Sequence, residues 1–313
     1  MRVLVTGGLG FVGSNLVDLL VREGCTVTVM DNLCSESSSR SYSNENSTYW
    51  IDDVRNLDKS KYSKEKFDIV FHLAAHARIQ PSFEHPLDYL SNDIMGTAAA
   101  CDYSRRVGAR FVYAGSSTAF GDEYLNPYAF AKRSGERVCE MYHEVYGMST
   151  AIARFFNVYG PRQPITGPWA TVVGKFEELT KKEKPLTIVG DGEQRRDFTH
   201  VDDIVRGLYE LGIKDWTKFD ATPIFSLGTG TNYSINELAN MFGGLKTRIP
   251  ARPGEVRITL AEPEFMKEET GWHAKKSLKK YVRSFMKKCK NVQKSDTINT
   301  WKTIKNLRQK LPF

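Results

Sequence analysis

Long hydrophobic runs and paired cysteines are both missing from this 313-residue sequence. No apolar run approaches the roughly 20 residues that a membrane-spanning helix needs, so we expect no membrane span. The five cysteines are scattered, and none belongs to a Cys-x-x-Cys pair, so neither a disulfide framework nor a zinc site is predicted. The first residues, MRVLVTGG, lead directly into a strand pattern, and we expect no secretory signal segment. These absences predict a cytoplasmic protein without a metal site.

Positive charge is concentrated at one end of the chain. The net charge is +7, but the segment from Lys267 onward holds 14 Lys and Arg residues against three Asp and Glu residues. That segment has a charge of +11, so the 266 preceding residues carry −4. A basic segment can bind nucleic acid or anionic lipid. Because few aromatic residues interrupt it, we favour a solvated helical face and do not expect nucleic-acid binding.

Short apolar stretches alternate with helical periodicity in the first half of the chain. They are rich in Val, Ile and Phe and cover residues 2–7, 26–31, 67–75, 109–117 and 149–158. Near-continuous apolar strands separated by helices predict an α/β fold with a doubly wound parallel sheet covered on both faces. The pattern becomes irregular from about residue 160, where a smaller second region begins. Within that region, Ser234 is predicted to cap a helix that follows a strand and a turn.

A glycine-rich turn follows the first predicted strand. Gly7, Gly10 and Gly13 stand between this strand and an amphipathic helix, where glycine permits a tight turn and close approach of a pyrophosphate. Asp31 ends the second strand, and a carboxylate there can accept hydrogen bonds from an adenosine ribose while repelling a 2′-phosphate. The combination predicts a Rossmann-type site for NAD rather than NADP. The alternative is a turn that needs glycine and binds nothing.

The stretch YAGSSTAFGDEYLNPYAFAK contains Ser116, Tyr128 and Lys132. Asn126 can cap a helix and Pro127 suits its first position, which puts the tyrosine and the lysine one turn apart on one helical face. The ammonium is expected to lower the pKa of Tyr128, as would a positively charged nicotinamide ring. A phenolate can take a proton from a sugar hydroxyl as hydride leaves for NAD, while Ser116 bridges substrate and phenol. The alternative is a surface helix with an incidental tyrosine and lysine.

With these residues in place, the chain resembles the extended short-chain dehydrogenase/reductases, and among them NAD-dependent nucleotide-sugar epimerases of the UDP-glucose 4-epimerase kind. The resemblance runs from residue 1 to about residue 285. The motifs that support it are TGGLGFVG, DN at 31–32, HLAAHA at 72–77, SST at 116–118, PYAFAK at 127–132, RFFNVYGPRQ at 154–163 and GDGEQRRDFTHVDD at 190–203. It implies a homodimer that retains NAD, removes hydride from C4 of a UDP-sugar, and returns it to the other face of a 4-keto intermediate. Tyr128 is then the acid/base, Lys132 its activator and nicotinamide-ribose anchor, and Ser116 the hydrogen-bonding partner.

The expected organisation has two parts. Residues 1–160 form an NAD-binding Rossmann domain, with a return segment near 197–213, and residues 161–313 form a smaller, mixed α/β substrate-binding domain with the basic C-terminal tail. Asp53 and Val54 are expected to flank the adenine; the alternative is that Asp53 only caps a strand end. The full set of expected cofactor-binding residues is Gly7, Gly10, Phe11, Val12, Gly13, Asp31, Asn32, Asp53, Val54, Leu73, Ala74, Ala75, Tyr128, Lys132 and Phe155. By resemblance, the expected substrate-binding residues are Ser117, Thr118, Asn157, Arg196, Arg252, Glu255 and Thr259, with the two arginines and Asn157 on the diphosphate.

The triplet SST separates this chain from related reactions. The 4,6-dehydratases that resemble it have Asp-Glu at the positions of Ser117 and Thr118, UDP-glucuronate decarboxylases usually keep Glu at the second position, and keto-sugar epimerase/reductases typically have Cys there. None of these is present, which favours interconversion of UDP-glucose and UDP-galactose. A UDP-glucuronate epimerase/decarboxylase or a nucleotide-sugar 4,6-dehydratase stays the alternative. A non-catalytic dinucleotide-binding sensor is the alternative of another class.

Thr259 matches a gate position where a large aromatic residue excludes N-acetylated sugars in some relatives. UDP-GlcNAc and UDP-GalNAc are therefore expected as additional substrates. Two features depart from the family pattern: residues 122–126 replace a longer loop, and Asp93 stands where relatives generally have Asn. His76 and His200 are interpreted as structural.

Overall fold

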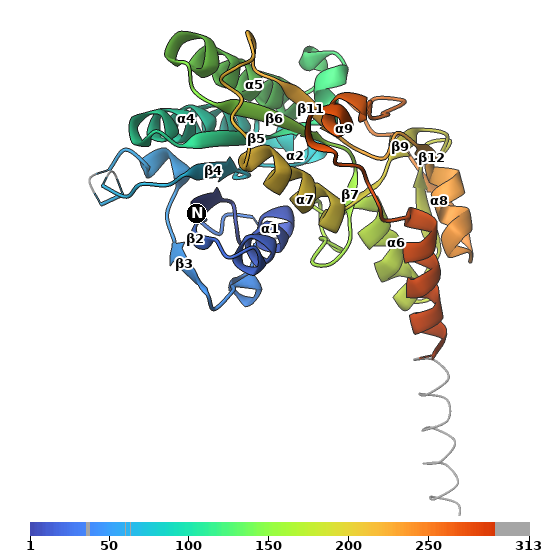
Figure 1. The fold of residues 1–313 in the computed structure, drawn as a ribbon. Helices are drawn as coiled ribbons and strands as arrows, with labels where there is room; N and C mark the ends of the chain where they lie inside the picture. The colour runs from blue at the N-terminus through green and yellow to red at the C-terminus, as the bar shows by residue number, and fades with distance from the viewer. Residues whose placement is uncertain (36–37, 60, 63, 292–313) are drawn as a thin grey trace, which may run out of the picture.

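A seven-stranded parallel sheet forms the centre of the computed structural model, which describes residues 1–35, 38–59, 61–62 and 64–291 (Figure 1). The strands in chain order are β1 (Arg2–Thr6), β2 (Thr26–Met30), β3 (Ser47–Trp50), β4 (Ile69–His72), β5 (Arg110–Ser116), β6 (Thr150–Phe155) and β11 (Ile224–Leu227). They lie in the order β11-β6-β5-β4-β1-β2-β3, and every pair is parallel. This order confirms the predicted doubly wound Rossmann-type sheet.

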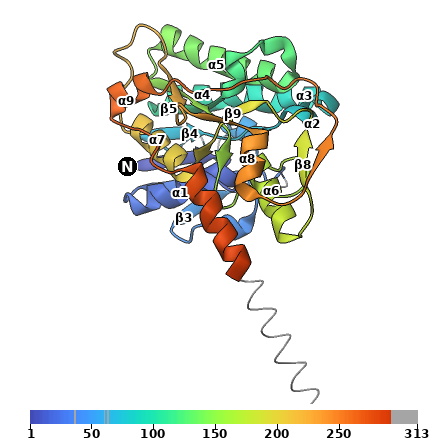
Figure 2. The same ribbon diagram turned by 90° about the vertical axis from the view of Figure 1, so that its right-hand side faces the viewer.

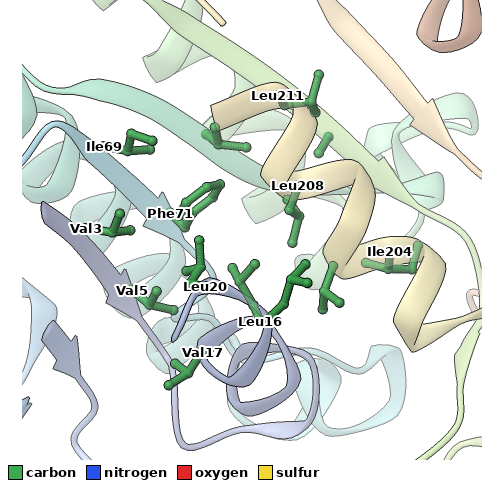
Figure 3. Close-up of a cluster of buried hydrophobic side chains, with 14 of the residues drawn as sticks. Val3, Val5, Leu16, Val17, Leu20, Ile69, Phe71, Ile204, Leu208 and Leu211 are labelled. Carbon is green, nitrogen blue, oxygen red and sulfur yellow. The ribbon is translucent and has the colours of Figure 1, made fainter. Parts of the chain in front are cut away.

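Helices cover both faces of the sheet. One face carries α1 (Phe11–Arg22) and α7 (Val201–Gly212), and the other carries α4 (Gly96–Val107) and α5 (Pro127–Tyr146). Figure 3 shows the first layer, where side chains of β1 and β4 meet those of α1 and α7, among them Val3, Val5, Leu16, Leu20, Ile69, Phe71, Ile204 and Leu208. Val3 and Val5 face this layer, whereas Leu4 between them belongs to the opposite layer. Burial on both faces explains the unbroken apolar character of these strands.

Of the two edge strands, β3 is not among the strands expected from the sequence, whereas β11 overlaps the strand expected before the turn that leads to Ser234. β3 has four residues, none of them fully buried, so its sequence lacks a strong apolar signal. β11 follows α7 in the chain and pairs with β6, while α7 packs on the sheet. α7 lies within the expected return segment, and β11 extends that return to Leu227. The division of the chain into two domains stays a prediction.

A second group of elements surrounds a separate core beside the sheet. It contains α6 (Val172–Lys181), α8 (Ile235–Phe242), the parallel pair of β8 (Leu186–Val189) and β13 (Lys246–Ile249), and a helix over residues 278–291. Figures 1 and 2 both place α6, α8 and this last helix together. Ser234 caps α8 in a reciprocal pair of hydrogen bonds with Glu237, as predicted.

The helix over residues 278–291 belongs to the basic end of the chain. It buries Leu278 and Val282 in the second core and leaves Lys279 and Lys280 exposed, which agrees with a solvated basic face. Residues 292–313 of the expected basic tail lie outside the described residues. Within the described part of the chain, no helix combines the length and the apolar character that crossing a bilayer requires.

Short elements connect the second group to the end of the sheet. They are α2 (Ile79–Glu84), α3 (Pro86–Tyr89), a π-helical segment (Leu90–Met95), β7 (Val158–Tyr159), β9 (Arg195–Asp197), β10 (Thr199–His200), β12 (Asn232–Ser234) and α9 (Glu264–Thr270). β10 pairs with β7 just beyond β6, while β9 pairs with β12. This pairing brings the segment that contains Arg196 to the carboxyl edge of the sheet.

Candidate active site

A cavity of about 470 Å³ opens at the carboxyl edge of the sheet. It lies at β1, which has β2 on one side and β4 on the other, so that the chain continues in opposite directions across the sheet from this point. Ligands of open parallel sheets bind at such a point. With the exception of Asp53, every residue expected to bind cofactor or substrate lines this cavity. These residues are Gly7, Gly10, Phe11, Val12, Gly13, Asp31, Asn32, Val54, Leu73, Ala74, Ala75, Ser116, Ser117, Thr118, Tyr128, Lys132, Phe155, Asn157, Arg196, Arg252, Glu255 and Thr259.

The turn between β1 and α1 requires glycine at two positions. Gly7 has a φ of +72°, and a Cβ there would lie 2.7 Å from the backbone nitrogen of Ala74. A Cβ at Gly13 would lie 2.1 Å from the carbonyl oxygen of Gly7, so α1 packs on the turn only without a side chain at that position. Gly10 is the N-cap of α1, and no side chain caps the helix. The N–H groups of its first turn can therefore receive an anion, which fits the diphosphate of NAD.

We expect Gly13→Ala to abolish the retention of NAD during purification. The added methyl group would push α1 away from the carbonyl oxygen of Gly7 and so move the N–H groups that face the cavity. The measurement is the NAD released from the denatured protein, per mole of chain. Gly10→Ala is the comparison, because a Cβ there has its nearest neighbour at 3.3 Å and should cost less NAD. Full NAD occupancy in Gly13→Ala would contradict the assignment of this turn.

Asp31 is fixed by backbone contacts at the end of β2. One carboxylate oxygen accepts a hydrogen bond from the N–H of Leu9 at 2.9 Å, and the other accepts from the N–H of Leu33 at 2.8 Å. Burial raises the pKa of this carboxyl, while the two N–H donors oppose the rise. Each oxygen keeps a further lone pair for a ribose hydroxyl, so the geometry fits the adenosine ribose of NAD.

Asp53 does not line the cavity, although its neighbours Asp52 and Val54 do. It caps the 3₁₀ helix Val54–Asn56, and its carboxylate binds the guanidinium of Arg55 through Nε and Nη2 at 2.8 Å each. One oxygen also accepts from the side chain of Asn32 at 3.0 Å. The Arg55 hydrogen bonds hold the pKa of Asp53 at about 2. Asp53 therefore caps a short helix, whereas the alternative to an adenine contact was a cap at a strand end.

α5 presents Tyr128 and Lys132 to the cavity. Asn126 caps this helix by accepting a hydrogen bond from the N–H three residues on, at 2.8 Å, and a proline fills the first helical position, as predicted. Lys132 is 5% exposed, and its ammonium donates to the carbonyl oxygen of Ala114 in β5 at 3.0 Å. Burial lowers the pKa of Lys132. An ammonium has three donors, so others are left for a ribose hydroxyl.

The pKa of Tyr128 differs from the expectation. Burial raises it, the Ser116 hydroxyl lowers it through a hydrogen bond, and the Asp93 carboxylate raises it again. Lys132, whose ammonium donates to the β5 carbonyl, is not among the groups that shift the pKa of Tyr128. In the protein alone, Tyr128 is therefore a neutral phenol at neutral pH.

Ser116 ends β5 beside the same tyrosine. Its Oγ accepts hydrogen bonds from the N–H and the hydroxyl of Thr118, at 3.2 and 3.0 Å, at the start of the 3₁₀ helix Ser117–Phe120. The Ser116 hydroxyl also forms a side-chain hydrogen bond with the phenol of Tyr128, and this bond lowers the pKa of the phenol. β5 and α5 thus bring Ser116, Tyr128 and Lys132 together on the cavity wall.

Asp93, the departure from the family pattern, lies in the π-helical segment Leu90–Met95 and is 1% exposed. One carboxylate oxygen accepts from the N–H of His76 at 2.8 Å and from the side chain of Asn92 at 2.9 Å. The other oxygen is buried without a partner among the described residues. Burial raises the pKa of Asp93, and the charge of Lys132 lowers it. Aspartate at this position thus places a buried acidic group close to both Tyr128 and Lys132.

The expected substrate-binding residues come from separate segments that meet at the cavity. Glu255 lies between two arginines, with Arg196 Nη2 at 3.5 Å and Arg252 Nη1 at 3.9 Å from its carboxylate oxygens. Asn157 donates to a β9 carbonyl oxygen at 3.4 Å. Thr259 is buried, and its hydroxyl has no partner among the described residues. This side of the cavity therefore contains two guanidinium groups and two polar side chains suited to a phosphorylated sugar.

The cavity also has lining residues that the sequence pattern did not reveal. Arg78 and Gln80 lie at the start of α2, and Trp169 lies in the irregular segment after residue 160. The position of Arg78 shortly after a parallel strand was an available signal; Trp169 had none, because its segment shows no periodicity. His200 caps α7 through its ring nitrogen and lies outside the lining, in agreement with a structural role. Residues 122–126, the shortened loop, do not line the cavity either.

Comparison with known proteins shows similarity in sequence and in fold. The NAD dependent epimerase/dehydratase family matches residues 3–214. A UDP-glucuronate 4-epimerase of Thermodesulfobacterium geofontis is 30% identical over 314 residues, which cover 90% of this chain and 93% of that protein. The structure of UDP-glucose 4-epimerase from Thermotoga maritima with UDP-glucose has a TM-score of 0.85 at 29% identity, covering 94% of this chain and 100% of that one. UDP-glucuronic acid 4-epimerase from Bacillus cereus, solved with UDP-glucuronic acid and NAD, has a TM-score of 0.82 at 26% identity, with coverage of 93% and 100%.

These matches confirm the resemblance that the motifs indicated, and with it an enzyme that depends on NAD. The named sugars differ among the similar proteins, so the likeness fixes the type of enzyme and leaves the sugar open. Because the matched residues make up well over half of the sequence and include the glycine turn, β5 and α5, the chain belongs to the NAD-dependent epimerase/dehydratase family.

Proposed function

We propose that the chain is a UDP-sugar 4-epimerase that interconverts UDP-glucose and UDP-galactose. The observation that carries this proposal is the convergence of Ser116, Tyr128 and Lys132 on a cavity that also contains the glycine turn and Asp31. A dinucleotide-binding sensor would need the last two features, but it has no use for a serine, a tyrosine and a lysine gathered beside them.

We assign the proton transfer in this reaction to Tyr128. When bound, NAD would be held by the glycine turn, Asp31 and Lys132, and it would supply the acceptor and donor for the C4 hydride together with the positive charge of its oxidised ring. Tyr128, as the phenolate, takes the proton of the C4 hydroxyl as C4 becomes a ketone, and it gives the proton back to O4 when C4 is reduced. Ser116 orients the same oxygen, and Lys132 holds a ribose hydroxyl. Burial and Asp93 both oppose the phenolate, so proton loss from Tyr128 should limit the rate at low pH.

Carboxylates at the cavity support epimerisation over elimination or decarboxylation. Those among the lining residues are Asp31, Asp52 and Glu255. Asp31 accepts from backbone at the β2 end, Lys61 lowers the pKa of Asp52, and Glu255 lies between two arginines. None of the three stands at the Ser117–Thr118 positions, where an additional acid or base would act on the sugar.

The proposal also covers further substrates, the parts of the chain that bind each ligand, the oligomeric state and the location. Thr259 is a small polar side chain in the lining, and its hydroxyl has no partner in the part of the chain that the structure describes, which supports UDP-GlcNAc and UDP-GalNAc as further substrates. Residues 1–160, with α7 and β11, would bind NAD, and the later segments with Arg196 and Arg252 would bind the UDP-sugar. We also propose a homodimer and a cytoplasmic location; the five cysteines are free, as a reducing compartment requires.

The decisive experiment is incubation of the purified chain with UDP-galactose and no added cofactor, followed by NMR of the sugar. We expect UDP-glucose to appear, since NAD is retained. A 4-keto-6-deoxy product would replace the proposal by dehydration, and UDP-xylose made from UDP-glucuronate would replace it by decarboxylation. Binding of NAD without conversion of any UDP-sugar would support the sensor.

A further inference from the structure

The last described helix has a surface with charge of one sign. Residues 271–291 contain eight Lys and Arg residues and no Asp or Glu. The opposite side of the helix is fixed in the second core, because Leu278 and Val282 are buried there. All eight cationic side chains are exposed, and together they form what we call the basic surface: Lys275, Lys276, Lys279, Lys280, Arg283, Lys287, Lys288 and Lys290.

The charges of the basic surface are mostly uncompensated. Lys276 lies 3.4 Å from the carboxylate of Asp202. This is the only ion pair within 4.0 Å that the eight cations form with a carboxylate in the part of the chain that the structure describes. Lys279 lies over the ring of Tyr233, with its ammonium 5.4 Å from the ring centroid. Cations crowded on one helix repel each other, so the basic surface is suited to an anionic partner.

The stability of the helix does not explain these charges. The helix starts after Ser277, whose hydroxyl accepts from the N–H of Lys280 at 3.4 Å. Lys275 and Lys276 come directly before this start. Lys279 and Lys280 lie in the first turn. The start of a helix is the positive end of its dipole and favours acidic residues, so these four lysines oppose the dipole.

The basic surface lies on a projecting part of the molecule, away from the cavity. Figures 1 and 2 show the helix over residues 278–291 extending outward beyond α6 and α8. None of the eight cations lines the cavity. A flat partner can therefore contact the basic surface while ligands enter and leave the cavity.

We propose that the basic surface docks the protein on an anionic lipid bilayer. Every exposed residue from Lys275 to Lys290 is Lys, Arg or Ser. Such a face has no aromatic ring to stack on a base and no amide to read a base edge, and a single arginine offers little bidentate phosphate recognition. Anionic head groups require only cations close to the membrane surface, so lipid is favoured over nucleic acid. The docking is independent of the proposed reaction.

The sequence beyond the described residues has a composition that fits the same partner. Residues 292–313 contain five Lys and Arg residues against one Asp. Between them stand large apolar residues, which suit the boundary between head groups and acyl chains: Ile298, Trp301, Ile304, Leu307, Leu311 and Phe313. The basic surface itself does not include them. The contact is peripheral, since no described helix is long and apolar enough to cross a bilayer.

Co-sedimentation of the purified full chain with lipid vesicles tests the docking. We expect binding to vesicles of phosphatidylcholine with about one-third phosphatidylglycerol, and none to vesicles of phosphatidylcholine alone. Raising the salt from about 0.1 M to about 1 M should release the protein, because the Debye length falls from roughly 10 Å to 3 Å. These measurements use the wild-type chain and do not depend on the folding of a variant.

A triple variant then locates the binding surface. Lys280→Gln, Arg283→Gln and Lys287→Gln together should weaken binding to the anionic vesicles about 100-fold, since each cation near such a surface contributes roughly a factor of five. The matched control is the triple substitution of Lys59, Lys64 and Lys66 by Gln. These lysines are exposed and lie before β4, on the other side of the molecule (Figure 1). Both variants have a net charge of +4, and the control should bind like the wild type.

Three results would overturn the proposal. One is equal binding of the wild type to neutral and anionic vesicles, and another is equal weakening of binding in the two triple variants. The third is binding to a DNA duplex at about 0.1 M salt, measured by fluorescence anisotropy, without any binding to the anionic vesicles, because the basic surface would then serve nucleic acid.

Discussion

Replacing Tyr128 by phenylalanine should lower kcat for the conversion of UDP-galactose to UDP-glucose by about 10²- to 10⁴-fold, the usual range for loss of a general acid/base. The phenylalanine ring keeps the packing against Tyr89, whose ring lies 6.2 Å away in an edge-to-face arrangement, but it lacks the oxygen that we propose exchanges a proton with the C4 hydroxyl. NMR of the sugar under single-turnover conditions measures the loss. The NAD content of the variant is measured in parallel and turnover is expressed per mole of bound NAD, which separates this effect from loss of the cofactor.

The titration of Tyr128 should also appear in the pH dependence of kcat for the wild-type enzyme. Burial and Asp93 raise the pKa of Tyr128, so the phenolate fraction and kcat should increase as the pH rises through the neutral range.

Tyr124→Phe is the matched control for Tyr128→Phe. Tyr124 lies two residues before the cap of α5, is 76% exposed and lies outside the cavity lining. Tyr128→Phe turnover within threefold of the wild type would refute the assignment of the acid/base.

Glu136→Ala should destabilise the folded protein by about 3–5 kcal/mol, the cost of removing one partner of a buried ion pair. Glu136 is completely buried on α5, one turn after Lys132. Its carboxylate accepts from Arg154 Nε at 2.8 Å and Nη2 at 2.7 Å in β6, and from Arg133 Nη1 at 2.7 Å. Without it, the guanidinium of Arg154, whose side chain is 11% exposed, loses this carboxylate and α5 loses a bidentate contact with the sheet.

Urea-induced unfolding followed by circular dichroism measures this loss as a lower midpoint. Glu140→Ala is the control on the same helix, since Glu140 lies 3.6 Å from Arg133 and its side chain is 31% exposed. An exposed pair of this kind contributes about 0–1 kcal/mol. Equal unfolding midpoints for the two variants would show that the Glu136 carboxylate does not anchor α5.

The sequence predicts those parts of the site whose structure depends on residues close together in the chain. The glycine turn follows from backbone geometry at Gly7 and Gly13, and the start of α5 follows from the cap at Asn126. The expected lowering of the Tyr128 pKa by Lys132 was wrong, because the spacing of residues on a helix does not show the burial of the phenol or the neighbouring Asp93 carboxylate. The direction of the Lys132 ammonium depends on the carbonyl oxygen of Ala114, which is brought near by tertiary packing.

The features that the sequence did not predict depend on contacts that the motif patterns do not show. Asp53 and Arg55 are two residues apart and pair with each other, a local competition that the nucleotide-binding pattern does not reveal. Trp169 reaches the cavity from a segment without regular structure, and β11 joins the sheet only because α7 returns the chain to it. Such contacts depend on chain path, which periodicity alone does not specify.

The late arrival of β11 has a consequence during synthesis on the ribosome. β6 is almost entirely apolar in its first four residues, and β11 hydrogen-bonds along its outer side. A nascent chain that has emerged only as far as α6 would present β6 as an open edge able to pair with other chains. Translation through residue 227 closes this edge, so shortened products ending before that point should be prone to aggregate even though their glycine turn, β5 and α5 are complete.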